Sequence, residues 1–123
     1  MRNILISGAN RGIGLKIAYK ELQEGNRLSL GVRDMESIKG SIIDPKNWKK
    51  GQVIVNKYDA LNINTAKDWI KNTIAQFGSF DTLINCSGSL SKKINQAVKV
   101  CFFEFSSLMT FNISIKFTFI YFS

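Results

Sequence analysis

The chain has 123 residues, of which 45% are hydrophobic and 21% charged. This composition is typical of a single globular domain and excludes an intrinsically disordered protein. Seventeen lysines and arginines against nine acidic residues give a formal net charge of +8. The basic residues are scattered and form no run longer than two, as at Lys49-Lys50, which predicts a solvated surface. We therefore expect neither a nucleic acid nor a membrane as a partner.

Cysteine and histidine usage narrows the chemistry. The two cysteines, Cys86 and Cys101, provide neither a disulfide framework nor a C-x-x-C motif. The apolar stretch after Arg2 is too short for the core of a signal peptide, so we predict a reducing, cytoplasmic location. Histidine is absent, which excludes histidine-dependent triads and removes the commonest metal ligand, and we expect no metal.

Strand and helix patterns alternate from the start of the chain. Residues 3–7 form a short apolar run that ends at glycines, which predicts a buried parallel strand. Helical spacing begins at Gly12, and Gly25-Asn26 ends the helix. Residues 28–32 are predicted as a second strand and residues 35–50 as a short helix with a loop. The apolar face of the first helix would comprise Ile13, Ile17, Ala18 and Leu22.

A third strand is predicted over residues 53–58 and a fourth over residues 81–85. Residues 65–77 between them predict an amphipathic helix, with Thr65 or Asn64 as its N-cap. Strands that alternate with helices predict parallel βαβ units, and hence a doubly wound α/β sheet. The apolar face of this helix would comprise Ala66, Trp69, Ile70, Thr73, Ile74 and Phe77.

The composition changes near the end of the sequence. Seven of the nine phenylalanines lie between Cys101 and Phe122, but Asn112, Ser114 and Lys116 interrupt the apolar run, which is too short for a transmembrane span. We interpret residues 101–123 as an aromatic-rich helix that continues a domain over residues 1–100; a frameshifted tail is the alternative. Uncovered apolar surface promotes association, so we expect residues 102–122 to self-associate or to be poorly protected from amide exchange.

The turn after the first strand reads S-G-A-N-R-G-I-G over residues 7–14. Glycines let the backbone turn tightly and approach a pyrophosphate, and the following helix offers free N–H groups and the positive end of its dipole. A P-loop is excluded, because Ile13 stands where its second glycine is required. A strand, a glycine turn and a helix in succession predict a dinucleotide site.

This G-x-x-x-G-x-G spacing closely resembles the fingerprint of the short-chain dehydrogenase/reductase family. Asp59-Ala60 resembles the family's pair that hydrogen-bonds the adenine ring. Asn85-Cys86-Ser87-Gly88 stands where the family has N-N-A-G and matches it at Asn85 and Gly88 only. Asn112 lies 27 residues beyond Asn85, about where the family places the asparagine of its catalytic tetrad.

The resemblance implies a Rossmann-like fold, truncated after the fourth strand and part of the following helix. It also implies Asn112 as a catalytic residue. The cofactor-binding residues that it implies are Gly8, Asn10, Arg11, Gly12, Ile13, Gly14, Arg33, Asp59, Ala60, Asn85, Ser87 and Gly88.

Cofactor choice follows from the end of the second strand. In the family an acidic residue there binds the ribose 2′-hydroxyl and selects NAD. Val32 occupies that place, Arg33 follows it, and Arg11 lies inside the glycine turn. Two guanidinium groups suit a 2′-phosphate, so the sequence predicts NADP, with NAD as the alternative. Asp34 counts against this prediction, because its carboxylate would repel the phosphate.

Enzymes of the family use a tyrosine as general acid or base, a lysine four residues later that lowers its pKa, and a serine that orients the substrate. None of Tyr19, Tyr58 and Tyr121 has a lysine in that position. We therefore expect an NADP-dependent oxidoreductase, acting on a small carbonyl compound or alcohol, in a truncated and inactive form. A non-catalytic NADP(H)-binding remnant or sensor is the alternative. A basic nucleic-acid-binding protein, with steep salt dependence, would be the third interpretation.

Overall fold

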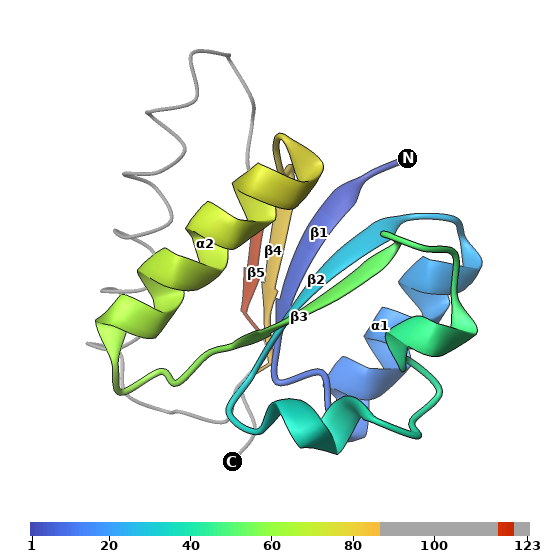
Figure 1. Ribbon diagram of the computed structural model, residues 1–123, viewed down its shortest axis with the longest axis horizontal. Coiled ribbons are helices and arrows are strands. Elements are labelled where there is room, and N and C mark those ends of the chain that lie inside the picture. The colour runs from blue at the N-terminus through green and yellow to red at the C-terminus, as the bar shows by residue number, and fades with distance from the viewer. Residues whose placement is uncertain (87–115, 120–123) are drawn as a thin grey trace.

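The computed structural model describes residues 1–86 and the strand at 116–119. Within these residues the strands form a single parallel sheet in the order β3-β2-β1-β4-β5 (Figure 1). This is the Rossmann-like arrangement predicted from the sequence. The strands are β1 (Asn3–Ser7), β2 (Arg27–Val32), β3 (Val53–Lys57), β4 (Thr82–Asn85) and β5 (Lys116–Phe119).

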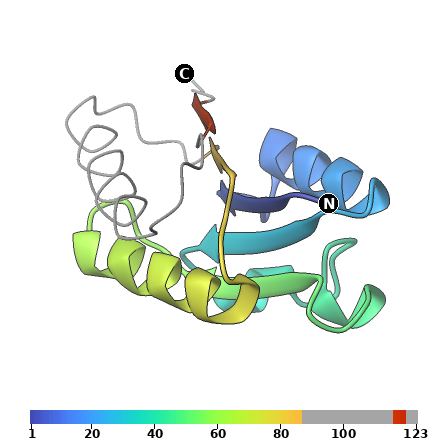
Figure 2. The ribbon, with the colours of Figure 1, turned by 90° about the horizontal axis from the view of Figure 1, so that it is seen from above.

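Two helices, α1 (Gly12–Gln23) and α2 (Ile63–Phe77), cover opposite faces of the sheet (Figures 1 and 2). All residues of β1 are buried, as expected for a central strand with a helix on each face. Alternate residues of the strands point to the two faces and form two hydrophobic cores. The core under α1 includes Ile4, Ile6, Leu28, Leu30, Ala18 and Leu22; the core under α2 includes Leu5, Leu83, Ala66, Trp69 and Ile70.

Helix α1 follows its predicted face with one exception. Ala18 and Leu22 are buried, and Ile17 packs against the same core. Ile13 is 45% exposed and lines a pocket described below.

Helix α2 has the predicted apolar face but a different N-cap. It begins at Ile63, and the Asn62 side chain accepts a hydrogen bond from the Asn64 N–H. The prediction of Thr65 or Asn64 as cap is therefore wrong. The Thr65 hydroxyl is bonded elsewhere: it lies 2.6 Å from the Asn62 carbonyl oxygen, to which it donates, and it accepts a hydrogen bond from the Asp59 N–H.

The segment between β2 and β3 contains two short 3₁₀ helices, η1 (Met35–Ile38) and η2 (Pro45–Asn47), where a short helix and a loop were predicted. Each has an aspartate as N-cap. Asp34 accepts from the Glu36 N–H at 3.0 Å, and Asp44 accepts from the Lys46 N–H at 3.0 Å. Side-chain caps of this kind satisfy N–H groups that have no partner within the helix.

The prediction of a helix over residues 101–123 is wrong for residues 116–119, which form β5 beside β4. The sheet thus has one strand more than the four predicted. Lys-Phe-Thr-Phe contains aromatic and β-branched residues, which favour a strand once a pairing edge is available. The rest of the segment, including Asn112, lies outside the described residues, as do Ser87 and Gly88, so self-association through residues 102–122 stays a prediction.

Among the residues that the structure describes, no helix is both long enough and apolar enough to cross a lipid bilayer.

Candidate functional site

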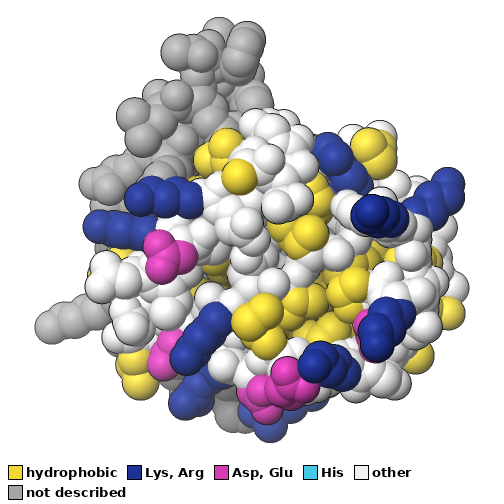
Figure 3. Space-filling model, viewed as in Figure 1, with side chains coloured by type: hydrophobic (Ala, Val, Ile, Leu, Met, Phe, Trp, Pro, Cys, Tyr) yellow, Lys and Arg dark blue, Asp and Glu magenta, His cyan; other side chains and the backbone are white. Residues whose placement is uncertain are grey.

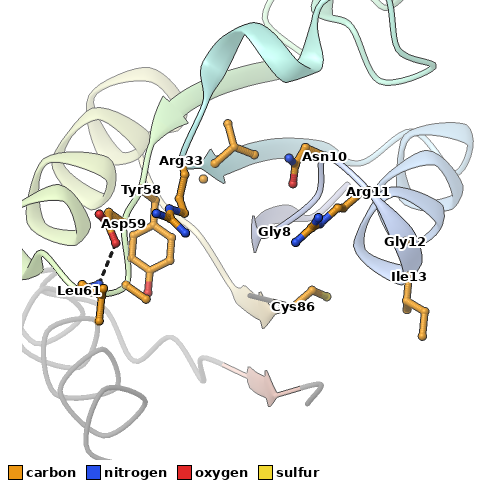
Figure 4. A pocket seen from close by; sticks show the side chains of 13 residues that line it. Gly8, Asn10, Arg11, Gly12, Ile13, Arg33, Tyr58, Asp59, Leu61 and Cys86 are labelled. Atoms are coloured by element: carbon orange, nitrogen blue, oxygen red, sulfur yellow. Dashed lines mark hydrogen bonds between the residues drawn. The ribbon is translucent and has the colours of Figure 1, made fainter. Parts of the chain in front are cut away.

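A pocket of about 650 Å³ lies at the carboxyl ends of the strands (Figure 4). Its walls come from the residues that follow β1 and β3, from the end of β2 and from the first residue after β4. In open α/β sheets, ligands bind at this edge, where the chain connections diverge to either side. The lining residues are Gly8, Asn10, Arg11, Gly12, Ile13, Gly31, Val32, Arg33, Tyr58, Asp59, Ala60, Leu61 and Cys86.

The pocket brings together most of the residues predicted to bind a cofactor. Gly14 and Asn85 are buried behind its wall and do not line it. Ser87, Gly88 and the predicted catalytic Asn112 lie outside the described residues. The predicted residues that do line it are Gly8, Asn10, Arg11, Gly12, Ile13, Arg33, Asp59 and Ala60.

The glycine turn forms one side of the pocket. Gly8 and Gly12 have φ angles of 71° and 61°, in the left-handed region that residues with a Cβ atom adopt at an energetic cost. Gly14 has a different role. A Cβ atom there would lie 2.4 Å from the Gly8 carbonyl oxygen, so the first turn of α1 packs directly on the backbone of the glycine turn.

The N-terminus of α1 differs from the other helix starts in the described residues. Its N-cap residue, Arg11, makes no side-chain capping bond, and no acidic residue lies in the first turn. The corresponding starts of α2, η1 and η2 are capped by Asn62, Asp34 and Asp44. The first N–H groups of α1 and the positive end of its dipole therefore suit an anion at the pocket.

Hydrogen bonds fix the strand ends around the pocket. The Gly8 N–H donates to the Gly31 carbonyl oxygen at 3.0 Å, and the Cys86 N–H donates to the Ser7 carbonyl oxygen at 3.1 Å. Between β1 and β4, the buried Ser7 hydroxyl donates to Asn85 Oδ1. Asn85 is thus placed as a link between two strands, and its predicted contact with a cofactor stays a prediction.

The loop after β3 is tied to α2. The Asp59 carboxylate accepts a hydrogen bond from the Leu61 N–H at 2.9 Å, drawn as a dashed line in Figure 4. The Asp59 N–H donates to Thr65 Oγ1 of α2 at 2.9 Å. Leu61 is 76% exposed and forms part of the mouth of the pocket. The loop therefore presents both a carboxylate and apolar surface, a combination that suits a planar, polar base.

Two arginines extend toward the open space of the pocket from opposite sides (Figure 4). Arg11 belongs to the glycine turn and Arg33 follows β2, and both are exposed. Neither guanidinium group makes a hydrogen bond or an ion pair with another residue in the described part of the chain. Two unpaired cations directed at one cavity favour an anionic ligand.

The motifs do not predict five of the lining residues as cofactor contacts: Gly31, Val32, Tyr58, Leu61 and Cys86. A glycine inside a strand signals a close approach by another group. At Gly31 that group is Trp69, whose ring would lie 2.7 Å from an added Cβ atom. Tyr58 packs against the same indole, with ring centroids 5.0 Å apart. These contacts join different elements of the fold, so no pattern within one element signals them.

Cys86 is a free thiol that is only 6% exposed. Burial raises the pKa of this thiol, because a thiolate loses solvation in an apolar environment. Cys86 therefore contributes a neutral, apolar wall at neutral pH.

The fold and the pocket together define a dinucleotide-binding α/β domain. A family model described as short chain dehydrogenase matches residues 2–120. The chain belongs to the short-chain dehydrogenase/reductase family, an oxidoreductase family that binds NAD(P).

Individual relatives agree with this assignment. Over 85 residues, which are 69% of the chain, it is 34% identical to 11-beta-hydroxysteroid dehydrogenase-like 2 of Arabidopsis thaliana, covering 28% of that protein. A short-chain dehydrogenase/reductase structure from Brucella melitensis, described as a glucose/ribitol dehydrogenase, superposes with a TM-score of 0.65 at 26% identity; the match covers 73% of this chain and 37% of that one. A short chain dehydrogenase from Bacillus anthracis superposes with a TM-score of 0.78 over 98% of this chain and 54% of that one; at 18% identity this match concerns the fold alone. The chain thus spans between 19% and 36% of the length of the curated relatives that it matches.

Proposed function

We propose that this chain is the cofactor-binding part of an NADP-dependent oxidoreductase that transfers a hydride between the nicotinamide and a small carbonyl compound or alcohol. Family membership supports the reaction class. The observation that carries the choice of NADP is the pair of arginines, Arg11 and Arg33, that extend into the pocket without a partner in the part of the chain that the structure describes (Figure 4).

The residues present fit a dinucleotide. Gly8 and Gly12 line the pocket and leave room for a pyrophosphate beside the backbone. Gly14 lets the first turn of α1 pack on Gly8, with which a side chain at position 14 would collide. The uncapped first turn of α1 supplies N–H donors for the pyrophosphate. Asp59 and Ala60 would hold the adenine ring at the opposite wall. When bound, the cofactor supplies or accepts the hydride.

The surroundings of Arg33 favour a 2′-phosphate over a 2′-hydroxyl. Val32, at the place where NAD-selecting members of the family carry an acid, is buried and apolar. From the sequence, the Asp34 carboxylate is expected to repel a 2′-phosphate. In the structure it accepts a hydrogen bond from the Glu36 N–H, and Asp34 does not line the pocket. The cations that face the pocket are thus not offset by an acid at the end of β2.

Replacing Arg33 by alanine should weaken NADP⁺ binding about ten- to a hundredfold, because a hydrogen bond to a charged group contributes about 1.5–3 kcal/mol. NAD⁺ binding should change little. Calorimetric titration of both cofactors at fixed ionic strength measures this. Lys16→Ala, which removes one positive charge from an exposed position of α1 outside the pocket, is the matched control. Equal affinity of the wild-type chain for NADP⁺ and NAD⁺ would refute the proposed selectivity.

The 123-residue polypeptide should bind NADPH without reducing carbonyl compounds. Hydride arrival at a carbonyl carbon creates an alkoxide, which requires a positioned proton donor. The sequence has no Tyr-x-x-x-Lys motif to provide one; we propose Asn112 as its only residue of the catalytic set. The measurement is NADPH absorbance with a panel of aldehydes, ketones and quinones, with Gly12→Asp as the cofactor-binding control. Turnover that this substitution abolishes would contradict the prediction and reveal an unrecognised donor.

A cytoplasmic location, and the lack of nucleic-acid or membrane partners, are also proposals. The first is supported by Cys86, a buried free thiol, since a reducing compartment preserves thiols. The second is supported by the distribution of charge. Lysine and arginine side chains are spread over the face shown in Figure 3 and do not gather into one patch.

A further inference from the structure

Arg33 is held by backbone hydrogen bonds on both sides. On its N-terminal side, the Val32 carbonyl oxygen accepts a hydrogen bond from the Tyr58 N–H at 2.8 Å, which fixes the end of β2 against β3. On its C-terminal side, Asp34 is the N-cap of η1. The Asp34 carbonyl oxygen accepts hydrogen bonds from both the N–H and the hydroxyl of Ser37. The backbone at Arg33 is therefore fixed, although its side chain is exposed and has no hydrogen-bond or ion-pair partner among the described residues.

The direction of the Asp34 carboxylate also matters, because this group is negatively charged and would repel a phosphate in the pocket. Its Oδ1 lies 3.0 Å from the Glu36 nitrogen at the start of η1. A carboxylate at a helix N-terminus is favourable because it meets unsatisfied N–H groups. This bond directs the carboxylate toward η1, and Asp34 is not among the residues that line the pocket.

We propose that Asp34 is a positioning residue for cofactor selectivity: by capping η1, it holds the backbone that presents Arg33 to the 2′-phosphate, and it keeps its own charge out of the pocket. The inference rests on the proposed function, since it concerns the same cofactor. Asp34 need not touch the nucleotide, and its effect should appear only with the cofactor that carries the 2′-phosphate.

Two substitutions separate the cap from the charge. Asn caps helices about as well as Asp, whereas Ala does not cap. Asp34→Asn therefore removes the charge and keeps the capping bond, and Asp34→Ala removes both. The two variants have the same net charge, so any difference between them reports the cap alone.

The experiment is a calorimetric titration of NADP⁺ and NAD⁺ into the 123-residue chain and its variants. Asp34→Asn should bind NADP⁺ at least as tightly as the wild type. Asp34→Ala should bind NADP⁺ about fivefold or more weakly than Asp34→Asn, the fold-change expected for one lost cap, and NAD⁺ affinity should agree between the two within about twofold. Ser37→Ala, which deletes only the hydroxyl that bonds the Asp34 carbonyl oxygen, should shift NADP⁺ affinity in the same direction by a smaller factor.

Asp44→Ala is the matched control, because Asp44 caps η2 with the same kind of hydrogen bond, but neither of its neighbours in the chain lines the pocket, whereas Arg33 precedes Asp34. It should lower the midpoint of thermal unfolding and leave the ratio of NADP⁺ to NAD⁺ affinity unchanged. The inference is overturned if Asp34→Ala and Asp34→Asn have the same NADP⁺ affinity, or if Asp34→Ala weakens both cofactors equally. A wild-type chain without preference for NADP⁺ would instead refute the proposed function, so the two failures are distinguishable.

Discussion

Replacing Trp69 by alanine is expected to lower the free energy of unfolding by about 3–5 kcal/mol, the usual effect of deleting a buried aromatic side chain. Trp69 is 1% exposed and lies in the core between α2 and the sheet. Its indole N–H donates to Ser29 Oγ at 2.8 Å, and that oxygen is also hydrogen-bonded to Thr73 Oγ1 at 2.7 Å. The substitution thus opens a cavity and removes one bond of a buried polar cluster. Because domains are stable by only about 5–15 kcal/mol, the substitution would remove a large fraction of the total stability.

Urea denaturation followed by far-UV circular dichroism measures the effect. Trp48→Ala, at a tryptophan that is only partly buried and lies on the α1 side of the sheet, should cost less. Gly31 provides a sharper check, because an added methyl group would meet the Trp69 ring at 2.7 Å. Gly31→Ala alone should lower the free energy of unfolding by about 1–3 kcal/mol. The same change should cost less in the Trp69→Leu variant. Strictly additive effects of the two substitutions would contradict this packing.

Replacing Gly14 by alanine should weaken both NADP⁺ and NAD⁺ more than about tenfold and destabilise the chain by about 1–3 kcal/mol. The new Cβ atom would lie 2.4 Å from the Gly8 carbonyl oxygen and 3.2 Å from the Ala9 Cα atom. Both are backbone atoms, so a side-chain rotation cannot relieve the contact. The first turn of α1 must move away from the glycine turn, and its N–H groups move with it.

Gly25→Ala is the control for that substitution. A Cβ atom at Gly25 meets nothing within 4 Å and Gly25 does not line the pocket, so the change tests only the φ angle of 85°, with an expected cost of about 1–2 kcal/mol. Equal loss of both cofactors on Gly14→Ala, measured by calorimetry, distinguishes pyrophosphate contacts from the 2′-phosphate contact of Arg33. Unchanged affinity in Gly14→Ala would show that the turn is not the phosphate site.

The sequence predicts the elements in residues 1–86 well because each carries a local signal. The apolar run at 3–7, the glycine turn and the 3.6-residue period of α2 are all readable within a short window. The N-cap of α2 cannot be identified from such a window, because Asn62, Asn64 and Thr65 can all cap a helix. The choice depends on the hydrogen bond between Thr65 and Asp59, which a helix taken in isolation does not contain. Likewise, β5 depends on pairing with the distant β4.

The residues of the candidate site also divide into those that a local sequence pattern predicts and those that depend on contacts between elements. Residues of the glycine turn and of Asp59-Ala60 are predicted because a phosphate or a base requires particular residues at fixed spacing. Tyr58 and Gly31 are not predicted as lining residues, because their positions depend on contacts with Trp69. Trp69 belongs to α2, a different element of the fold. Asp34 shows a further limit: its charge is visible in the sequence, but the direction of its carboxylate depends on η1.

The division of the core into two layers gives the chain two separate optical probes. The sequence has two tryptophans; Trp48 packs against the core under α1, and Trp69 lies in the core under α2. Trp69 is also in contact with Tyr58, which lines the pocket. The Trp48→Phe variant therefore carries a single indole fluorophore, buried in one known layer and separated from the pocket by one side chain, Tyr58. Its emission reports on that face of the sheet alone.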